Sequence, residues 1–305
     1  MTATFYDDLR ELALTPSEFG YEKCIGQLLM EKLTPLVDQI ETDPLGNMYA
    51  LRQGKLPGTV GLVAHQDKVM KSTILAYPSC ATPTSSLFTL VNGEYCKPED
   101  VACAGGIIYA LRFDEEHDHV RGKLDDTLGL SLIIDMLRTT SPENSHSILA
   151  VLTVGEEQGL HGATYAVKNN YIGQRYTPDV LFVLEASPAP LASGIILKKN
   201  CGVLPLERIC MNPQVPKPGP LTSGKYIPFV DALTQLAKQH DLTMTPQDDL
   251  STSDARVFAR RTNIPTIMLS IPVQNMHDAM ETSAKADIEQ LRTLLRIYLT
   301  HESLT

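Results

Sequence analysis

The sequence lacks the marks of several large classes of protein. Basic residues are outnumbered, with 26 Lys and Arg against 36 Asp and Glu, which gives a formal net charge of -10. Nonspecific binding of nucleic acid needs a basic surface, so this partner is not expected. No apolar run reaches the roughly 20 residues that span a bilayer, and residues 1–8 do not start a secretory signal. We therefore expect a cytoplasmic protein with neither a nucleic-acid nor a membrane partner.

Thiol and serine chemistry also lack their usual patterns. The six cysteines form no Cys-x-x-Cys pair, which argues against a structural zinc knuckle. In a chain of 305 residues without a secretory signal, we expect them to be free thiols in a reducing compartment. There is no Gly-x-Ser-x-Gly elbow, and the spacing of Ser251 and Ser253 from the histidines suggests no serine triad.

What the chain does contain is an alternation of apolar runs with segments of helical spacing. The apolar runs at 60–64, 148–154 and 180–184 predict buried strands, and helices are predicted between and after them. This alternation predicts an α/β fold with a mixed, mostly parallel sheet flanked by helices. Residues 71–121 are rich in Ser, Thr, Pro, Gly and β-forming residues, which predicts a small inserted β module. The catalytic domain would then comprise residues 1–70 and 122–305.

Histidines and carboxylates stand where the predicted strands end. Open α/β sheets bind ligands in the crevice at the carboxyl ends of their strands, so these side chains should converge there. Another acidic pair opens a predicted helix. The residues are His65 and Asp67 after the strand at 60–64, Glu156 and Glu157 after 148–154, Glu185 after 180–184, His277 after 267–271, and Asp125 with Asp126 at the helix start.

This set of side chains suits a pair of metal ions. Imidazole and carboxylate ligands without thiolates favour zinc, cobalt or manganese at a catalytic site. One carboxylate that bridges two ions holds them roughly 3.5–4 Å apart, and a water between them becomes a nucleophile near neutral pH. Of two adjacent glutamates, one can bind metal while its neighbour takes the proton of that water. Asp67 can accept the second imidazole N–H of His65 and fix the ring.

Five motifs follow one another along the chain in the order of a known family. They resemble the M42 glutamyl aminopeptidase family, which is related to the M20 and M28 families of di-metal peptidases, and the resemblance covers most of the chain outside the predicted insert. It implies a phosphorylase/hydrolase-like di-zinc peptidase core. The motifs are Ala64-His65-Gln66-Asp67, Leu124-Asp125-Asp126, Gly155-Glu156-Glu157-Gln158-Gly159-Leu160-His161-Gly162-Ala163, Ser253-Asp254-Ala255 and Ile271-Pro272-Val273-Gln274-Asn275-Met276-His277.

The resemblance implies a metallo-aminopeptidase that hydrolyses the N-terminal residues of short peptides. It implies two divalent ions, with zinc expected and cobalt or manganese as alternatives. Homo-oligomers are expected too, since the β edges of the insert need cover. The implied roles are His65 and Glu185 as ligands of one ion, Glu157 and His277 as ligands of the other, Asp125 as the bridge, Glu156 as the general base, and Asp67 as the residue that orients His65.

Three alternatives stay open. Carboxypeptidases and deacylases of the M20 type tend to have Glu at the position of Glu185, where aminopeptidases tend to have Asp, so an M20-like carboxypeptidase or N-acyl amino-acid deacylase is a rival. A catalytically silent binding or assembly protein is another, although every predicted ligand and the base are present. Asp126 competes with Asp125 for the bridge, and one of the two is expected to cap the helix. His161, and His117 with His119, are interpreted as a helix-start residue and as a solvated turn.

Overall fold

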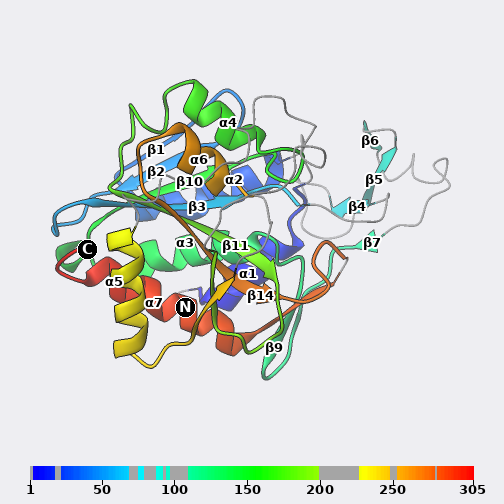
Figure 1. Cartoon of the computed structure of the whole chain (residues 1–305). Coiled ribbons are helices and arrows are strands. Elements are labelled where there is room, and N and C mark those ends of the chain that lie inside the picture. Colours follow the sequence, from blue (N-terminus) through cyan, green and yellow to red (C-terminus); the bar gives the residue numbers. More distant parts are fainter. Residues whose placement is uncertain are drawn as a thin grey trace.

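The structure is a computed structural model that describes residues 3–17, 22–68, 75–78, 87–91, 94–96, 109–198, 227–247, 253–278 and 280–305. An eight-stranded sheet forms its centre, in the order β1-β2-β10-β3-β11-β14-β12-β13 (Figure 1). The strands are β1 (Gln39–Thr42), β2 (Met48–Arg52), β3 (Thr59–His65), β10 (Ser147–Thr153), β11 (Val180–Pro188), β12 (Ile195–Lys198), β13 (Met244–Gln247) and β14 (Thr266–Val273).

The middle of this sheet is parallel and its flanks are mixed. Strands β10, β3, β11 and β14 run parallel to one another. Strand β2 is antiparallel to β1 and β10, and β12 is antiparallel to β14. The prediction of a mixed, mostly parallel sheet is therefore confirmed. Because the four central strands share one direction, their carboxyl ends meet at one rim.

Helices cover both faces of the sheet. Helices α4 and α6 lie on one face, and α1, α3, α5 and α7 on the other (Figure 1). Each face has its own apolar core, so the strands between them are buried nearly throughout. The helices are α1 (Phe5–Leu14), α2 (Lys23–Leu33), α3 (Thr127–Thr139), α4 (His161–Lys168), α5 (Ile227–Gln239), α6 (Ala255–Arg261) and α7 (Lys285–Thr300).

Helix α3 is the element that carries the acidic pair towards the rim. It is buried from Thr127 to Leu137, since it packs between the sheet and helices α1 and α7. Its N-cap is Asp126, whose side chain accepts the backbone N–H of Gly129. The C-terminal turn is held by Arg52 of β2, which donates to the backbone oxygens of Leu137 and Thr140. Both ends of α3 are thus fixed by buried polar contacts.

Two smaller sheets complete the described part of the chain. Strands β15 (Glu281–Ala284), β9 (His119–Gly122) and β8 (Asp114–Glu115) form a three-stranded sheet. Strands β4 (Leu75–Pro78), β5 (Leu87–Val91), β6 (Glu94–Cys96) and β7 (Tyr109–Ala110) form a four-stranded sheet in the order β6-β5-β4-β7. These four strands fall inside the predicted insert, 71–121, and its division from the catalytic domain stays a prediction.

Two expectations from the sequence need correction. Glu185 does not follow its strand but lies within β11, because β11 pairs with β14 as far as Pro188. Cys24 in α2 is disulfide-bonded, so the expectation that all six cysteines are free is wrong at this position. Across the part of the chain described here, no helix has both the length and the hydrophobicity that crossing a membrane demands.

Candidate metal centre

Asp125 lies between two histidines, each of which faces a different oxygen of its carboxyl group. His65 Nε2 is 3.2 Å from Asp125 Oδ1, and His277 Nε2 is 3.2 Å from Asp125 Oδ2. The two histidines come from the end of β3 and from the turn after β14, 212 residues apart by their numbers (277 − 65). The fold therefore gathers at one carboxylate the two imidazoles that the sequence singled out.

Each histidine also has a carboxylate partner of its own. Glu185 Oε1 of β11 is 3.3 Å from His65 Nε2, and Glu157 Oε1 is 3.4 Å from His277 Nε2. Two half-sites result: one with His65 and Glu185, and one with His277 and Glu157, with Asp125 common to both. All five predicted ligands come together in the structure.

The donor atoms fit divalent cations. Asp125 Oδ2 and Glu157 Oε1 are buried and accept no hydrogen bond, although His277 Nε2 lies within 3.4 Å of both. A buried carboxylate oxygen without a hydrogen bond costs free energy that a cation removes. The donor set of two imidazoles and three carboxylates, with no thiolate, is the one that zinc, cobalt and manganese accept.

Electrostatics at the centre favour positive charge. Burial alone lowers the pKa of His65, but Glu185, Asp125 and Asp67 raise it well above its usual value. Burial likewise raises the pKa of Asp125, yet the two imidazoles hold it well below its usual range. Burial raises the pKa of Glu157, and the charge of Asp125 adds to the effect. Carboxylates in this number repel one another unless imidazolium groups or metal cations lie between them.

Asp67 holds the segment that carries the glutamate pair. Its Oδ1 and Oδ2 accept the backbone N–H groups of Glu156 and Glu157, both at 3.0 Å. His65 Nδ1 lies 2.8 Å from the backbone oxygen of Asp67 and 3.5 Å from its Oδ1. Asp67 thus contacts the imidazole chiefly through its main chain, while its carboxylate fixes the position of the next loop.

Glu156 stands beside the five ligands rather than among them. Burial raises the pKa of its carboxyl group well above the usual value, and the nearby charges of Glu185, Glu157 and Asp254 raise it further, against a lowering by His65. Asp254 is buried next to it and accepts the hydroxyl of Thr153. Burial raises the pKa of Asp254 to about 7.

Asp126 is the residue of the acidic pair that caps α3. Its Oδ1 accepts the N–H of Gly129 at 2.9 Å, and its Oδ2 is 3.4 Å from the backbone nitrogen of His65. It lies close enough to His65 and Glu185 for a metal-ligand geometry. However, one oxygen of Asp126 already accepts the N–H group that caps α3. The carboxyl group of Asp125 makes neither of these two contacts. Of the histidines considered as alternatives, His117 is exposed and contacts Asp118, and His161 is the first residue of α4.

The sequence did not point to a buried ion pair beneath the centre. Lys123 Nζ donates to Glu281 Oε1 at 2.7 Å, and both side chains are fully buried. Glu281 also accepts backbone N–H groups from the two segments that carry Asp125 and His277. The sequence offers one clue to this ion pair, which is proximity to the motifs. Lys123 comes two residues before Asp125, and Glu281 comes four residues after His277.

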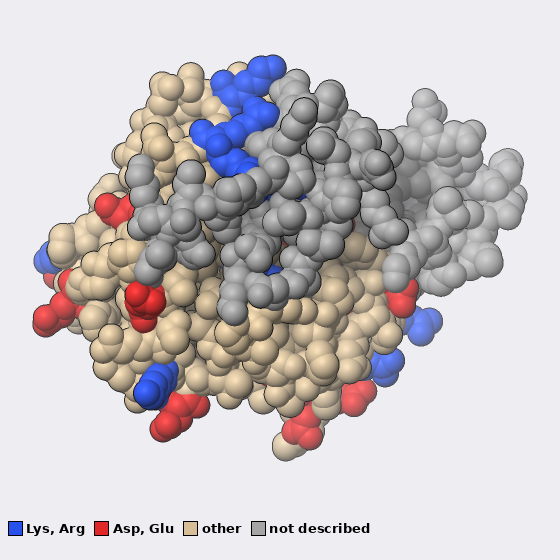
Figure 2. Space-filling view, viewed as in Figure 1, with Lys and Arg blue, Asp and Glu red and all other residues tan. Residues whose placement is uncertain are grey.

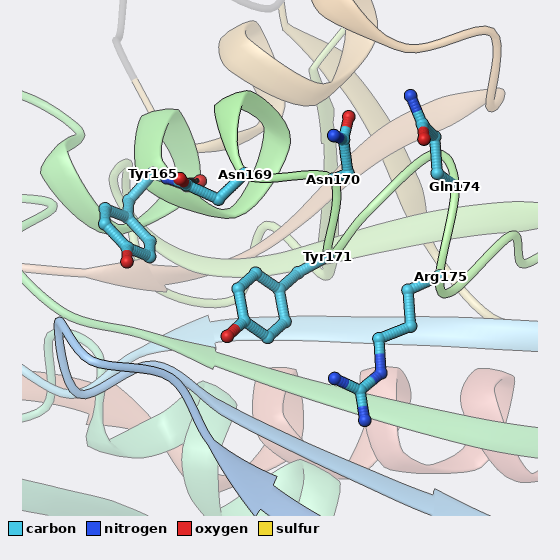
Figure 3. Close-up of a pocket in the computed structure, with 6 residues that line it drawn as sticks. All are labelled: Tyr165, Asn169, Asn170, Tyr171, Gln174 and Arg175. Carbon is cyan, nitrogen blue, oxygen red and sulfur yellow. Dashed lines mark hydrogen bonds between the residues drawn. The ribbon is translucent and has the colours of Figure 1, made fainter.

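The acidic side chains of this centre are separate from those on the surface. Asp and Glu residues visible in Figure 2 are dispersed around the edges of the described surface. An open cavity of about 630 Å³ is lined by Tyr165 and Tyr171 together with three amide side chains and Arg175. It contains none of the predicted ligands (Figure 3).

An α/β fold with imidazole and carboxylate side chains gathered at the strand ends is that of a metal-dependent peptidase. The sequence pattern of the M42 glutamyl aminopeptidase family matches residues 107–294, more than half of the chain, and the chain belongs to this family. The prediction of family is thus confirmed.

One curated relative agrees with this assignment. FrvX of Escherichia coli (strain K12), named as a candidate aminopeptidase, is 29% identical over 216 residues, which are 68% of this chain and 53% of FrvX. The chain therefore spans about half the length of this curated relative.

Solved structures show the fold. An aminopeptidase of the archaeon Desulfurococcus kamchatkensis matches with a TM-score of 0.72 at 17% identity, over 98% of this chain and 95% of that one. The TET1 peptidase of Pyrococcus horikoshii, described as able to assemble into a tetrahedron or a large octahedral shell, matches with a TM-score of 0.69 at 16% identity, over 98% and 100%. At these identities, the likeness extends to the fold alone.

Proposed function

We propose that the protein is a metal-dependent aminopeptidase that releases N-terminal residues from short peptides. The observation that carries this proposal is the position of Asp125, whose two oxygens each face one imidazole at 3.2 Å. His65 and Glu185 would hold one divalent ion, His277 and Glu157 the other, and Asp125 both. Zinc is the ion proposed, with cobalt and manganese as alternatives, since the donor set accepts all three. Membership of the M42 glutamyl aminopeptidase family supports the activity.

Two ions held by these residues would polarise the scissile carbonyl and lower the pKa of a bound water. The residues of the chain supply the rest. Glu156 is the proposed general base: burial raises the pKa of its carboxyl group well above the usual value, and a base beside the metals can take a proton and return it to the leaving amine. Asp67 keeps this base in place through the backbone N–H of Glu156. His65 is held in one orientation by the backbone oxygen of Asp67.

The rival proposal within the hydrolases is an M20-like carboxypeptidase or N-acyl amino-acid deacylase. It is favoured by one residue, Glu185, which lies 3.3 Å from His65 Nε2 where Asp would be usual in an aminopeptidase. The two activities make opposite demands on the substrate. An aminopeptidase needs a free amino group, whereas a deacylase needs that group to be blocked.

A hydrolysis panel separates the proposals. The metal-reconstituted protein is given free dipeptides and aminoacyl-anilides on one side, and N-acetylated amino acids and blocked peptides on the other. Glu156→Gln serves as the blank, because it should keep the bound metal and lose turnover. Glu143→Gln is the matched control, since Glu143 is an exposed glutamate that pairs with Lys55 on the surface.

The expected result is cleavage of only the free-amine substrates, with Glu143→Gln as active as the wild type. Cleavage of only the blocked substrates would replace the proposal with the deacylase or carboxypeptidase. No cleavage of either set by protein that carries two metals would favour a binding role. Full activity of Glu156→Gln would show that the base is another residue.

Homo-oligomer formation is a further part of the proposal. The support is the assembly stated for the TET1 peptidase of Pyrococcus horikoshii, which shares the fold. Light scattering coupled to size exclusion at micromolar concentration gives the mass directly. A mass equal to one chain of 33.5 kDa would contradict this part.

A further inference from the structure

Glu281 is a fully buried carboxylate to which four donors point. Its Oε1 accepts Lys123 Nζ and the backbone N–H of His277, both at 2.7 Å. Its Oε2 accepts the backbone N–H groups of Leu124 at 2.6 Å and Asp125 at 3.0 Å. All four partners are donors that cannot accept a hydrogen bond here, so the group that suits them is an ionised carboxylate with no proton of its own.

Two of these donors belong to proposed metal ligands on separate segments. Asp125 precedes α3, and His277 lies in the turn after β14. The side chains of these two residues also meet, with His277 Nε2 3.2 Å from Asp125 Oδ2. The carboxylate of Glu281 thus fixes the main chains of both Asp125, the proposed bridge, and His277, its partner in the second half-site. The backbone of His277 needs such a restraint, because its φ of 68° lies in the left-handed region, which costs free energy for a residue with a side chain.

We propose that Glu281 is a positioning residue of the metal centre, with Lys123 as its counter-ion, and that it sets the distance between Asp125 and His277. This inference rests on the proposed function, in that it takes these two residues as ligands of one divalent ion. Outer hydrogen bonds of this kind typically change metal affinity by about 10- to 100-fold.

Hydrogen-bond chemistry predicts which substitutions disrupt the four bonds that Glu281 accepts. In Glu281→Gln, an amide NH₂ replaces one oxygen and meets donors on either side, so at least one pair of hydrogen bonds is lost. The same substitution leaves Lys123 buried without a counter-charge, which destabilises the fold. Lys123→Met removes that charge and keeps three of the four hydrogen bonds to Glu281. The double variant Lys123→Met/Glu281→Gln has no unpaired charge but still has a mismatched amide, so it separates positioning from charge balance.

A matched control exists on α7. Asp287 is also fully buried, and it accepts the backbone N–H groups of Ala192 and Gly194, both at 2.8 Å. Neither partner is a proposed ligand. Asp287→Asn therefore removes a buried carboxylate that holds two backbone N–H groups, at a place with no role in the centre. A general effect of lost stability on metal binding would appear in this variant as well.

The experiment is a zinc titration of the full chain by calorimetry, with thermal unfolding recorded on the same samples. The wild type should bind two ions. In Glu281→Gln and in the double variant, the affinity for one of the two should fall about 10- to 100-fold, while Asp287→Asn binds both as the wild type does. Adding Glu281→Gln to His277→Ala should cause little further loss, since both act on one half-site. High zinc should restore turnover of Glu281→Gln, because the ligands themselves are intact.

Three results would overturn the inference. They are unchanged affinity for both ions in Glu281→Gln, an equal loss in Asp287→Asn, and full recovery of affinity in the double variant. The readout is metal binding, so it stays separate from the proposed activity. A wild type that binds two ions and cleaves no peptide would contradict the proposed function alone, whereas a wild type that binds fewer than two would contradict both.

Discussion

The carboxyl group of Asp67 accepts the backbone N–H of Glu156 through Oδ1, at 3.0 Å. Its other oxygen accepts the N–H of Glu157 in the same way. The sequence predicted that Asp67 orients His65, and the structure shows a second connection, to the loop that carries the proposed base. A single residue therefore links two sides of the centre.

The contact of Asp67 predicts a defect in turnover rather than in metal content. Asp67→Asn keeps the backbone oxygen that contacts His65 but brings an NH₂ group against one of the two backbone N–H groups. We expect kcat to fall about 10- to 100-fold, with two ions still bound. Steady-state kinetics and metal analysis of the same preparation measure both. If Asp67→Asn instead lost one ion while the protein that kept both ions had an unchanged kcat, the carboxylate of Asp67 would act through His65.

Asp126→Asn should have little effect, which separates the two members of the acidic pair. Asn caps helices about as well as Asp, so the bond to Gly129 can be kept. Burial raises the pKa of Asp126 well above its usual value, so a neutral side chain suits this position. We expect two ions and a free energy of unfolding within about 0.5 kcal/mol of the wild type. A lost ion would move the bridge from Asp125 to Asp126.

Asp254 should make the metal-free protein less stable as the pH rises. Burial raises the pKa of Asp254 from 3.8 to about 7, so the folded chain binds this proton more tightly than the unfolded chain. The stabilisation is complete below about pH 4 and is lost as the pH passes through about 7. Asp254→Asn should therefore be more stable than the wild type at pH 8, by about 1–4 kcal/mol, and equally stable at pH 4. Urea unfolding of chelator-treated protein at the two pH values measures this. The same difference in stability between Asp254→Asn and the wild type at both pH values would contradict it.

Arg52 should be important for the fold and not for the chemistry. Its guanidinium donates to Leu137 O, Thr140 O and Thr140 Oγ1 at 2.5–2.8 Å, at the C-terminal end of α3. Arg52→Met leaves these buried acceptors unpaired, and we expect a loss of about 1–3 kcal/mol in the free energy of unfolding, with the metal content unchanged. Arg175→Met is the control, because Arg175 pairs with Glu41 on the surface and should cost under about 1 kcal/mol. Equal urea midpoints for the two variants would refute the assignment.

The residues of the proposed centre follow a simple rule in the sequence. His65, Glu157 and Glu185 lie at or near the ends of parallel strands, and the ends of parallel strands meet at one rim. The hydrophobic pattern alone places those ends, apart from the last residues of β11, where pairing with β14 continues the strand beyond Glu185. Asp126 was expected to compete with Asp125, and its cap of α3 follows from the usual chemistry of helix starts.

Glu281 and Lys123 could not be found in this way. Glu281 begins a strand of four residues, Glu281–Ala284, which is too short and too polar for its periodicity to be recognised. Its contacts join Lys123 and Asp125 to a distant part of the chain, and no local pattern encodes such a pairing. Only the fold shows that a lysine before one motif and a glutamate after another meet beneath the centre.

We propose that one carboxylate, Asp125, serves two metal ions. Metal analysis of zinc-reconstituted protein, after removal of excess ions, tests it most directly. We expect two zinc ions per chain in the wild type, one each in His65→Ala and His277→Ala, and weakened binding of both ions in Asp125→Ala. A wild type that holds a single ion, or an Asp125→Ala variant that retains two, would contradict it.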